Sequence, residues 1–158
     1  MVLGFEALNL RKLADKVAAS TGFLVVVPDL LYGDYYDLDK PQFDLKSWLK
    51  AHREDKGYKD TKPLIAALKS KGISAIGVAG TVVAKLANSN DIQAAVVLHP
   101  GPTTNGDINN VKVPIAILAA EIDEFCPAEQ VKQFAEMLAL KSDQFDSFVK
   151  IYPGVVHG

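Results

Sequence analysis

The chain has 158 residues, a length that fits one domain and can bury a sizeable core. Hydrophobic residues make up 49% of it, charged residues 23%, and the formal net charge is −2, which excludes a disordered chain and a strongly cationic nucleic-acid or membrane-surface binder. No apolar run is long enough to span a bilayer, and the single cysteine, Cys126, excludes an internal disulfide.

These features favour a protein of the reduced cytoplasm. Because one cysteine cannot by itself hold a structural zinc ion, we expect no metal site, and we expect no cofactor. The first residues lack the charged and then apolar pattern of a secretory leader, which agrees with a cytoplasmic location.

Helical and extended segments alternate along the chain. Apolar residues at helical spacing predict a helix over 8–20, which Gly22 ends. The run FLVVV at 23–27 is short, continuous and rich in β-branched residues, and it predicts a strand buried on both faces. The alternation continues with predicted helices over 43–51, 58–70, 82–87 and 127–140 and predicted strands over 73–78, 93–98, 113–119 and 146–152.

Five strands separated by helices, without hairpin signals, predict βαβ crossovers and a mostly parallel sheet that helices cover on both faces. In such α/β sheets, ligands bind beyond the carboxyl ends of the strands. The candidate site residues are therefore those that follow a strand directly: Asp29, residues 77–81, His99, residues 121–123 and His157.

Two of these positions form a hydrolase pattern. Asp123 follows one predicted strand and His157 follows the next, which is the acid-then-histidine order of α/β-hydrolases. The acid would hold the imidazole in one tautomer, and the histidine would carry the proton of the nucleophile to the leaving group. The nucleophile belongs on the turn after an earlier strand, but the turn GVAGT at 77–81 has Ala79 at its apex, and a methyl group cannot attack a carbonyl.

The chain resembles the dienelactone hydrolase family, in particular plant members that carry glucanase-like names. The resemblance runs through nearly the whole chain and rests on NLRKLADKVAASTGFLVVVPDLLYGD, KPLIAALKSKGISAIGVAG, AAVVLHP, VKVPIAILAAEIDEFCP and FVKIYPGVVHG. It implies a single three-layer α/β-hydrolase domain over 1–158 and hydrolysis of small ester or lactone substrates by a Cys-Asp-His triad. In this resemblance, Asp123 matches the acid and His157 the histidine.

The chain also departs from the family pattern. Where plant members read roughly AAG-FCWGAK-VVVELA, it reads VAG-T-VVAKLA, so Thr81 replaces a stretch that contains the nucleophilic cysteine. The resemblance implies a fold truncated at both ends, and it matches the backbone N–H of Val2 to an oxyanion-hole donor. We therefore expect weak activity or none. A non-catalytic small-molecule-binding protein and an aberrant gene product are the alternatives, and exposed sheet edges favour self-association.

Several side chains have two interpretations. Thr81 is a substitute nucleophile activated by His157, or a helix N-cap. With Gly80 it also allows a phosphate cradle at a helix start. Cys126 is a substitute nucleophile or an apolar loop residue, and His99 lines a pocket or is a structural histidine.

Two further interpretations concern the first third of the chain. Tyr32, with its neighbours at 35 and 36, forms a pocket wall or covers the core. His52 lies in a stretch of mixed charge and is expected to face solvent.

Overall fold

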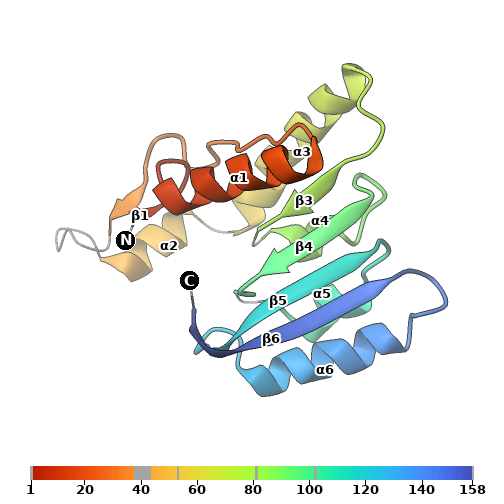
Figure 1. The fold of residues 1–158 in the computed structure, drawn as a ribbon. Coiled ribbons are helices and arrows are strands. Elements are labelled where there is room, and N and C mark those ends of the chain that lie inside the picture. Colours follow the sequence, from red (N-terminus) through yellow and green to blue (C-terminus); the bar gives the residue numbers. More distant parts are fainter. Residues whose placement is uncertain (1, 38–43, 53, 81, 102, 158) are drawn as a thin grey trace. The chain divides into compact units, whose positions relative to one another are not determined.

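The computed structural model describes residues 2–37, 44–52, 54–80, 82–101 and 103–157 (Figure 1). The chain divides into two compact units, Met1–Thr61 and Lys62–Gly158. None of the helices in the described ranges is both long enough and apolar enough to cross a membrane.

The first unit contains helix α1 (Leu8–Thr21), helix α2 (Leu45–Ala51), the start of helix α3 (Glu54–Ser70) and a short antiparallel pair, β1 (Val2–Leu3) with β2 (Tyr36–Asp37). The predicted end of α1 is confirmed: Gly22 has a φ of 72°, and its N–H donates to the carbonyl oxygen of Ala18. This left-handed conformation favours glycine, which has no Cβ to clash.

The predicted buried strand at 23–27 is wrong. The segment belongs to no ladder in the described part of the chain, and Phe23 and Leu24 are 73% and 75% exposed. An apolar, β-branched run predicts only that a segment suits a sheet, because the hydrogen bonds of a strand must come from a neighbouring strand. The local sequence does not supply that neighbour.

The second unit contains the parallel sheet that the sequence predicts. Its strands are β3 (Gly77–Ala79), β4 (Ala94–Leu98), β5 (Ile115–Ile122) and β6 (Ser147–Val156), hydrogen-bonded in that order, with each neighbouring pair parallel. The connections carry helices α4 (Val83–Leu86), α5 (Asn105–Asn109) and α6 (Ala128–Ala139). The fold class is therefore α/β, as predicted.

One face of the sheet forms the core with these helices. Ala95 and Val97 of β4 stand beside Ile115 and Ile117 of β5 in the ladder, and all four are buried. Helix α6 packs on β5 and β6 and contacts α5, which in turn contacts α4. The side chains that these helices bury are Val83, Ala84, Leu86, Ile108, Val131, Phe134 and Leu138.

Helix α5 was not expected from the sequence, which indicated only a chain break near 99–102. A capping box starts it: Thr104 accepts the N–H of Asp107, and the Asp107 carboxylate accepts the N–H of Thr104. This reciprocal pair satisfies N–H groups that the first turn of a helix leaves free, so a helix of one turn forms without a long apolar pattern.

The parallel arrangement determines where the candidate site residues lie. Because all four strands run in one direction, their carboxyl ends share one edge of the sheet. Ala79 ends β3, and the residues that directly follow β4, β5 and β6 are His99, Asp123 and His157.

Candidate active site

Asp123 and His157, predicted as acid and base, form a hydrogen-bonded pair. His157 Nδ1 lies 2.8 Å from Asp123 Oδ2, and the Asp123 side chain is fully buried while that of His157 is 30% exposed. A carboxylate only accepts hydrogen bonds, so Nδ1 carries the proton in this pair. In the neutral ring, Nε2 is then the acceptor, the form that a general base requires.

The loop after β5 holds Asp123 as a carboxylate. Its Oδ1 accepts the backbone N–H of Phe125 at 2.9 Å and that of Cys126 at 3.2 Å. Burial by itself would raise the pKa of Asp123, but the hydrogen bonds from His157 and from these two N–H groups outweigh it and lower the pKa. Asp123 is therefore ionised at neutral pH.

Two further rings contact His157. The His99 ring meets it edge to face with centroids 4.9 Å apart, and the Phe125 ring lies at 4.8 Å with a tilt of 54°. With Asp123 they restrict the imidazole on several sides. His99 therefore contacts the candidate pair directly, and its pocket-lining and structural interpretations both stay predictions.

His99 has an unusual local environment. Its φ is 33°, an uncommon conformation for any residue except glycine, and its backbone N–H donates to Leu118 at 2.8 Å. Its Nδ1 is buried without a hydrogen-bond partner among the described residues. Burial, and then the nearby His157, lower the pKa of His99, so its ring is neutral at physiological pH. Strained backbone and unpaired buried polar atoms are typical of functional sites.

Comparison with known proteins agrees with this geometry. The profile of the dienelactone hydrolase family matches residues 2–158. The chain belongs to the dienelactone hydrolase family. The family resemblance of the sequence is thereby confirmed.

Individual relatives support the assignment. The chain is 43% identical to a maize endo-1,3;1,4-beta-D-glucanase over 141 residues, which are 87% of this chain and 45% of the relative. It is 28% identical to hydrolase tropI of Talaromyces stipitatus, with 99% of this chain and 66% of that protein covered. The chain thus spans about half to two thirds of the length of these curated relatives.

A crystal structure from Klebsiella pneumoniae, described as that of a dienelactone hydrolase, has a TM-score of 0.72 to this chain. The two are 16% identical, and the match covers 94% of this chain and 69% of that one. At this identity the likeness concerns the fold, which is that of the α/β-hydrolase type.

The turn at which the sequence pattern predicts the nucleophile follows β3, which ends at Ala79, a residue without a hydroxyl or thiol. Gly80 follows with a φ of 137°, and its N–H donates to Val96 at 3.2 Å. Thr81 lies outside the described residues. Helix α4 has Val82 at its N-cap and is four residues long. The site roles of Gly80 and Thr81 stay predictions.

Val2 and Tyr32 both lie in the first unit. Val2 pairs with Asp37 in the β1–β2 ladder, and its role as an oxyanion-hole donor stays a prediction. The Tyr32 side chain is 69% exposed, and Lys56 Nζ lies 3.8 Å from its ring centroid. Of the three neighbouring tyrosines, Tyr36 is the buried one, at 5% exposure.

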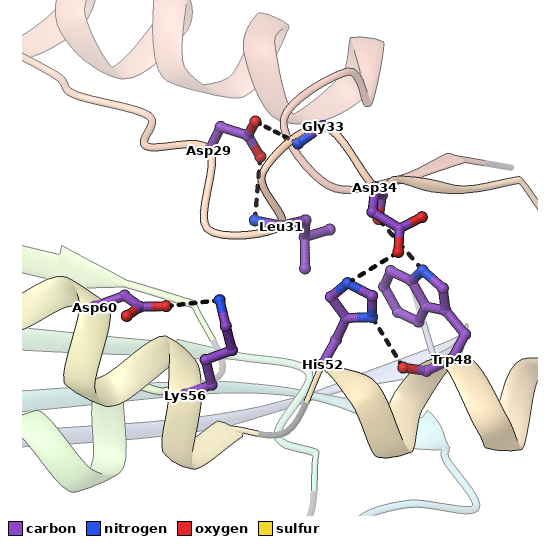
Figure 2. A network of polar contacts seen from close by, with 8 residues as sticks. All are labelled: Asp29, Leu31, Gly33, Asp34, Trp48, His52, Lys56 and Asp60. Carbon is purple, nitrogen blue, oxygen red and sulfur yellow. Dashed lines mark hydrogen bonds and ion pairs between the residues drawn. The ribbon is translucent and has the colours of Figure 1, made fainter.

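A second histidine–carboxylate contact lies in the first unit, near α2 (Figure 2). His52 Nε2 is 3.3 Å from Asp34 Oδ2, its Nδ1 is 2.9 Å from the Trp48 carbonyl oxygen, and its ring stacks on that of Trp48. The expected solvent-facing position of His52 is wrong, since 12% of its side chain is exposed. This cluster joins the loop around Asp34 to α2.

The loop around Asp34 also contains hydrogen bonds between its own residues. The Asp29 carboxylate accepts the N–H groups of Leu31 and Gly33 (Figure 2). Asp29, a candidate from its place after the predicted strand, therefore shapes a turn. In the described ranges, no group of three or more His, Cys, Asp or Glu side chains is arranged to hold a metal ion.

Cys126 has the environment of a structural thiol. It is fully buried, and its backbone N–H is bound by Asp123. Burial, and then the negative charge of Asp123, raise the pKa of the thiol from 9.0 to about 11. A nucleophilic cysteine needs the opposite, an accessible position and a lowered pKa, so these observations favour the apolar-loop interpretation.

We expect iodoacetamide at pH 8 to alkylate Cys126 at least about 100-fold more slowly in the folded chain than in concentrated urea. The raised pKa reduces the thiolate fraction by that factor, and burial adds to it. Mass spectrometry over a time course measures both rates in the same protein. Equal rates in the two states would contradict the structural role of this thiol.

Proposed function

We propose that this chain is a dienelactone hydrolase-family protein for small ester or lactone molecules that keeps the acid–base part of the machinery but lacks a competent nucleophile. One observation carries the proposal. The Asp123–His157 pair stands at the carboxyl edge of the sheet, whereas β3 ends on Ala79 at the same edge.

The chemistry follows from these groups. In an acyl transfer, His157 Nε2 would take a proton from the attacking group, and Asp123 would stabilise the resulting imidazolium. His157 would then return the proton to the leaving alkoxide. The attacking group must be a thiol or hydroxyl for a covalent acyl intermediate, and Ala79 has neither. Loss of the nucleophile from such a unit costs about 10⁶ in turnover, so water activated by His157 gives only slow hydrolysis.

A binding function is the second candidate, and the surface beside the pair favours it. Several large apolar side chains lie exposed on the two strands and loop that carry Asp123 and His157: Ile122, Phe125, Val155 and Val156. Exposed apolar side chains that gather at one place are typical of ligand-binding surfaces. An apolar ester or lactone would be held there without conversion.

We expect the chain to hydrolyse p-nitrophenyl butyrate with a turnover below about 1 s⁻¹, under the ordinary range of enzymes. The assay compares the wild type with His157→Ala and Cys126→Ala. A turnover above this limit that His157→Ala abolishes would overturn the absence of a competent nucleophile. Its loss in Cys126→Ala would identify the thiol as the attacking group.

A thermal-unfolding series with a non-hydrolysable lactam analogue tests the binding candidate. Binding to the folded state raises Tm in a concentration-dependent way. Ile122→Ser, at the exposed rim, should reduce that rise, whereas Leu140→Ser, exposed at the end of α6, serves as the control. A rise in Tm that both variants keep would exclude binding at this rim.

A further inference from the structure

The ladder between β5 and β6 changes register just before the Asp123–His157 pair. Ile115 pairs with Ser147, and the same offset holds as far as Ala120, which pairs with Tyr152. The next pair is Ile122 with Val156, so β6 advances four residues where β5 advances two. Residues 153–155 of β6 thus lie opposite Glu121 of β5 alone, and this excess of two residues forms a bulge in β6.

This bulge decides which side chain faces Asp123. With the earlier offset continued, the residue beside Asp123 would be Val155, and His157 would lie two residues further on. At the rise of an extended strand, that is roughly 6–7 Å along the chain. A hydrogen bond of 2.8 Å between Asp123 and His157 does not form across such a shift. The pair therefore depends on the bulge.

A hydrogen bond between the two strands holds the bulge in place. Pro153 has no N–H, and Gly154 has a φ of 70°, which takes its amide out of a regular ladder. The Gly154 N–H donates instead to Glu121 Oε2 at 2.7 Å. Glu121 comes from β5, two residues before Asp123, so the strand that carries the acid also holds the bulge of the strand that carries the base.

We propose that Glu121 is a positioning residue for His157: by holding the Gly154 N–H, its carboxylate keeps the bulge in β6 that places His157 beside Asp123. This inference rests on the role proposed for the Asp123–His157 pair. Because Glu121 is exposed, the carboxylate is free to serve this contact, and the core does not require it.

The experiment uses the ¹⁵N-labelled chain and two NMR readouts, the ring-nitrogen shifts of His157 and the exchange rate of the Gly154 amide. In Glu121→Ala we expect Gly154 exchange to accelerate about 5- to 30-fold and His157 to lose its preference for the Nδ1–H tautomer. Glu121→Gln keeps an acceptor oxygen and should retain both signals. If Glu121 had only a general structural role, Glu121→Ala and Glu121→Gln would not differ in the tautomer of His157.

Three further variants decide between explanations. Glu124→Ala removes an equal charge from the adjacent loop, and Glu124 is exposed; it should change neither signal. Gly154→Ala meets no atom within 4 Å but is strained by its positive φ, so it should reproduce Glu121→Ala even if that variant does not fold. Asp123→Asn tests the pair itself and should shift the His157 tautomer.

Retention of the Nδ1–H tautomer in both Glu121→Ala and Gly154→Ala would overturn the positioning role. An effect of Glu124→Ala as large as that of Glu121→Ala would also overturn it, because the cause would then be charge rather than the contact to Gly154. If Asp123→Asn alone leaves the His157 tautomer unchanged, the proposed acid–base pair is wrong instead.

Discussion

Replacing Asp123 by alanine is expected to lower the free energy of unfolding by about 3 kcal/mol, because it removes the buried acceptor that three N–H donors share. The N–H groups of Phe125 and Cys126 and the Nδ1–H of His157 all donate to this one carboxylate, whose side chain is fully buried. Urea unfolding followed by circular dichroism measures the loss, with an unchanged m-value as the sign of an intact fold.

Asp123→Asn is the matched control, because it keeps the shape and one acceptor oxygen. We expect it to cost only about 1 kcal/mol, the scale of one ordinary hydrogen bond. If alanine and asparagine cost the same, the N–H contacts to Oδ1 contribute nothing, and the assignment of the stabilisation to them would fail.

The stability difference between the wild type and Asp123→Asn also depends on pH, and the sign of this dependence is known. The pKa of Asp123 is lower in the folded chain than the ordinary value of 3.8, so the ionised form is favoured by folding. Its contribution is complete above about pH 4 and is lost as the pH falls through the lowered pKa. The stability difference between wild type and Asp123→Asn should therefore be constant from pH 5 to pH 7 and shrink in acid. A difference that grows in acid would contradict the direction of the shift.

Phe134→Ala is expected to have the largest effect on stability, a loss of about 3–5 kcal/mol. Phe134 is fully buried and lies on the face of α6 that also buries Val131 and Leu138 against the sheet. Removal of the ring leaves a cavity that this close-packed layer fills only in part. Urea or thermal unfolding measures the change.

Phe148→Ala is the control on the same sheet. Phe148 is in β6 with its side chain 54% exposed, so we expect a loss below about 1 kcal/mol. Comparable losses for the two substitutions would show that the helix-covered face of the sheet is not the main core.

Periodicity and turn residues were sufficient to predict most of the second unit. The apolar runs at 93–98 and 113–119 contain or overlap β4 and β5, and the helical pattern at 127–140 contains α6. In each of these segments the apolar residues have the pattern that is typical of the helix or strand that forms. The alternation of helices and strands along the chain favours parallel pairing. The same order placed Asp123 and His157 after neighbouring strands, where the structure has them hydrogen-bonded.

The first unit shows where local pattern does not suffice. The segment 23–27 has a pattern typical of a buried strand, yet Phe23 and Leu24 are exposed, because strand formation depends on partners elsewhere in the chain. His52 sits among charged residues, yet it is largely buried against Trp48 and Asp34. A stretch of mixed charge predicts that its side chains are exposed on average. A single side chain in the stretch is nevertheless buried when a neighbouring loop contacts it.

By itself, the sequence determined that the chain forms parallel βαβ units and that an acid and a histidine follow neighbouring strands, since both follow from residue types in chain order. Only the tertiary structure decided that these two side chains meet. Their meeting depends on the change of register at Pro153–Val155 and on the contact of Glu121 with Gly154, which join residues about thirty positions apart. Register is a property of two strands together, so neither strand's sequence specifies it alone.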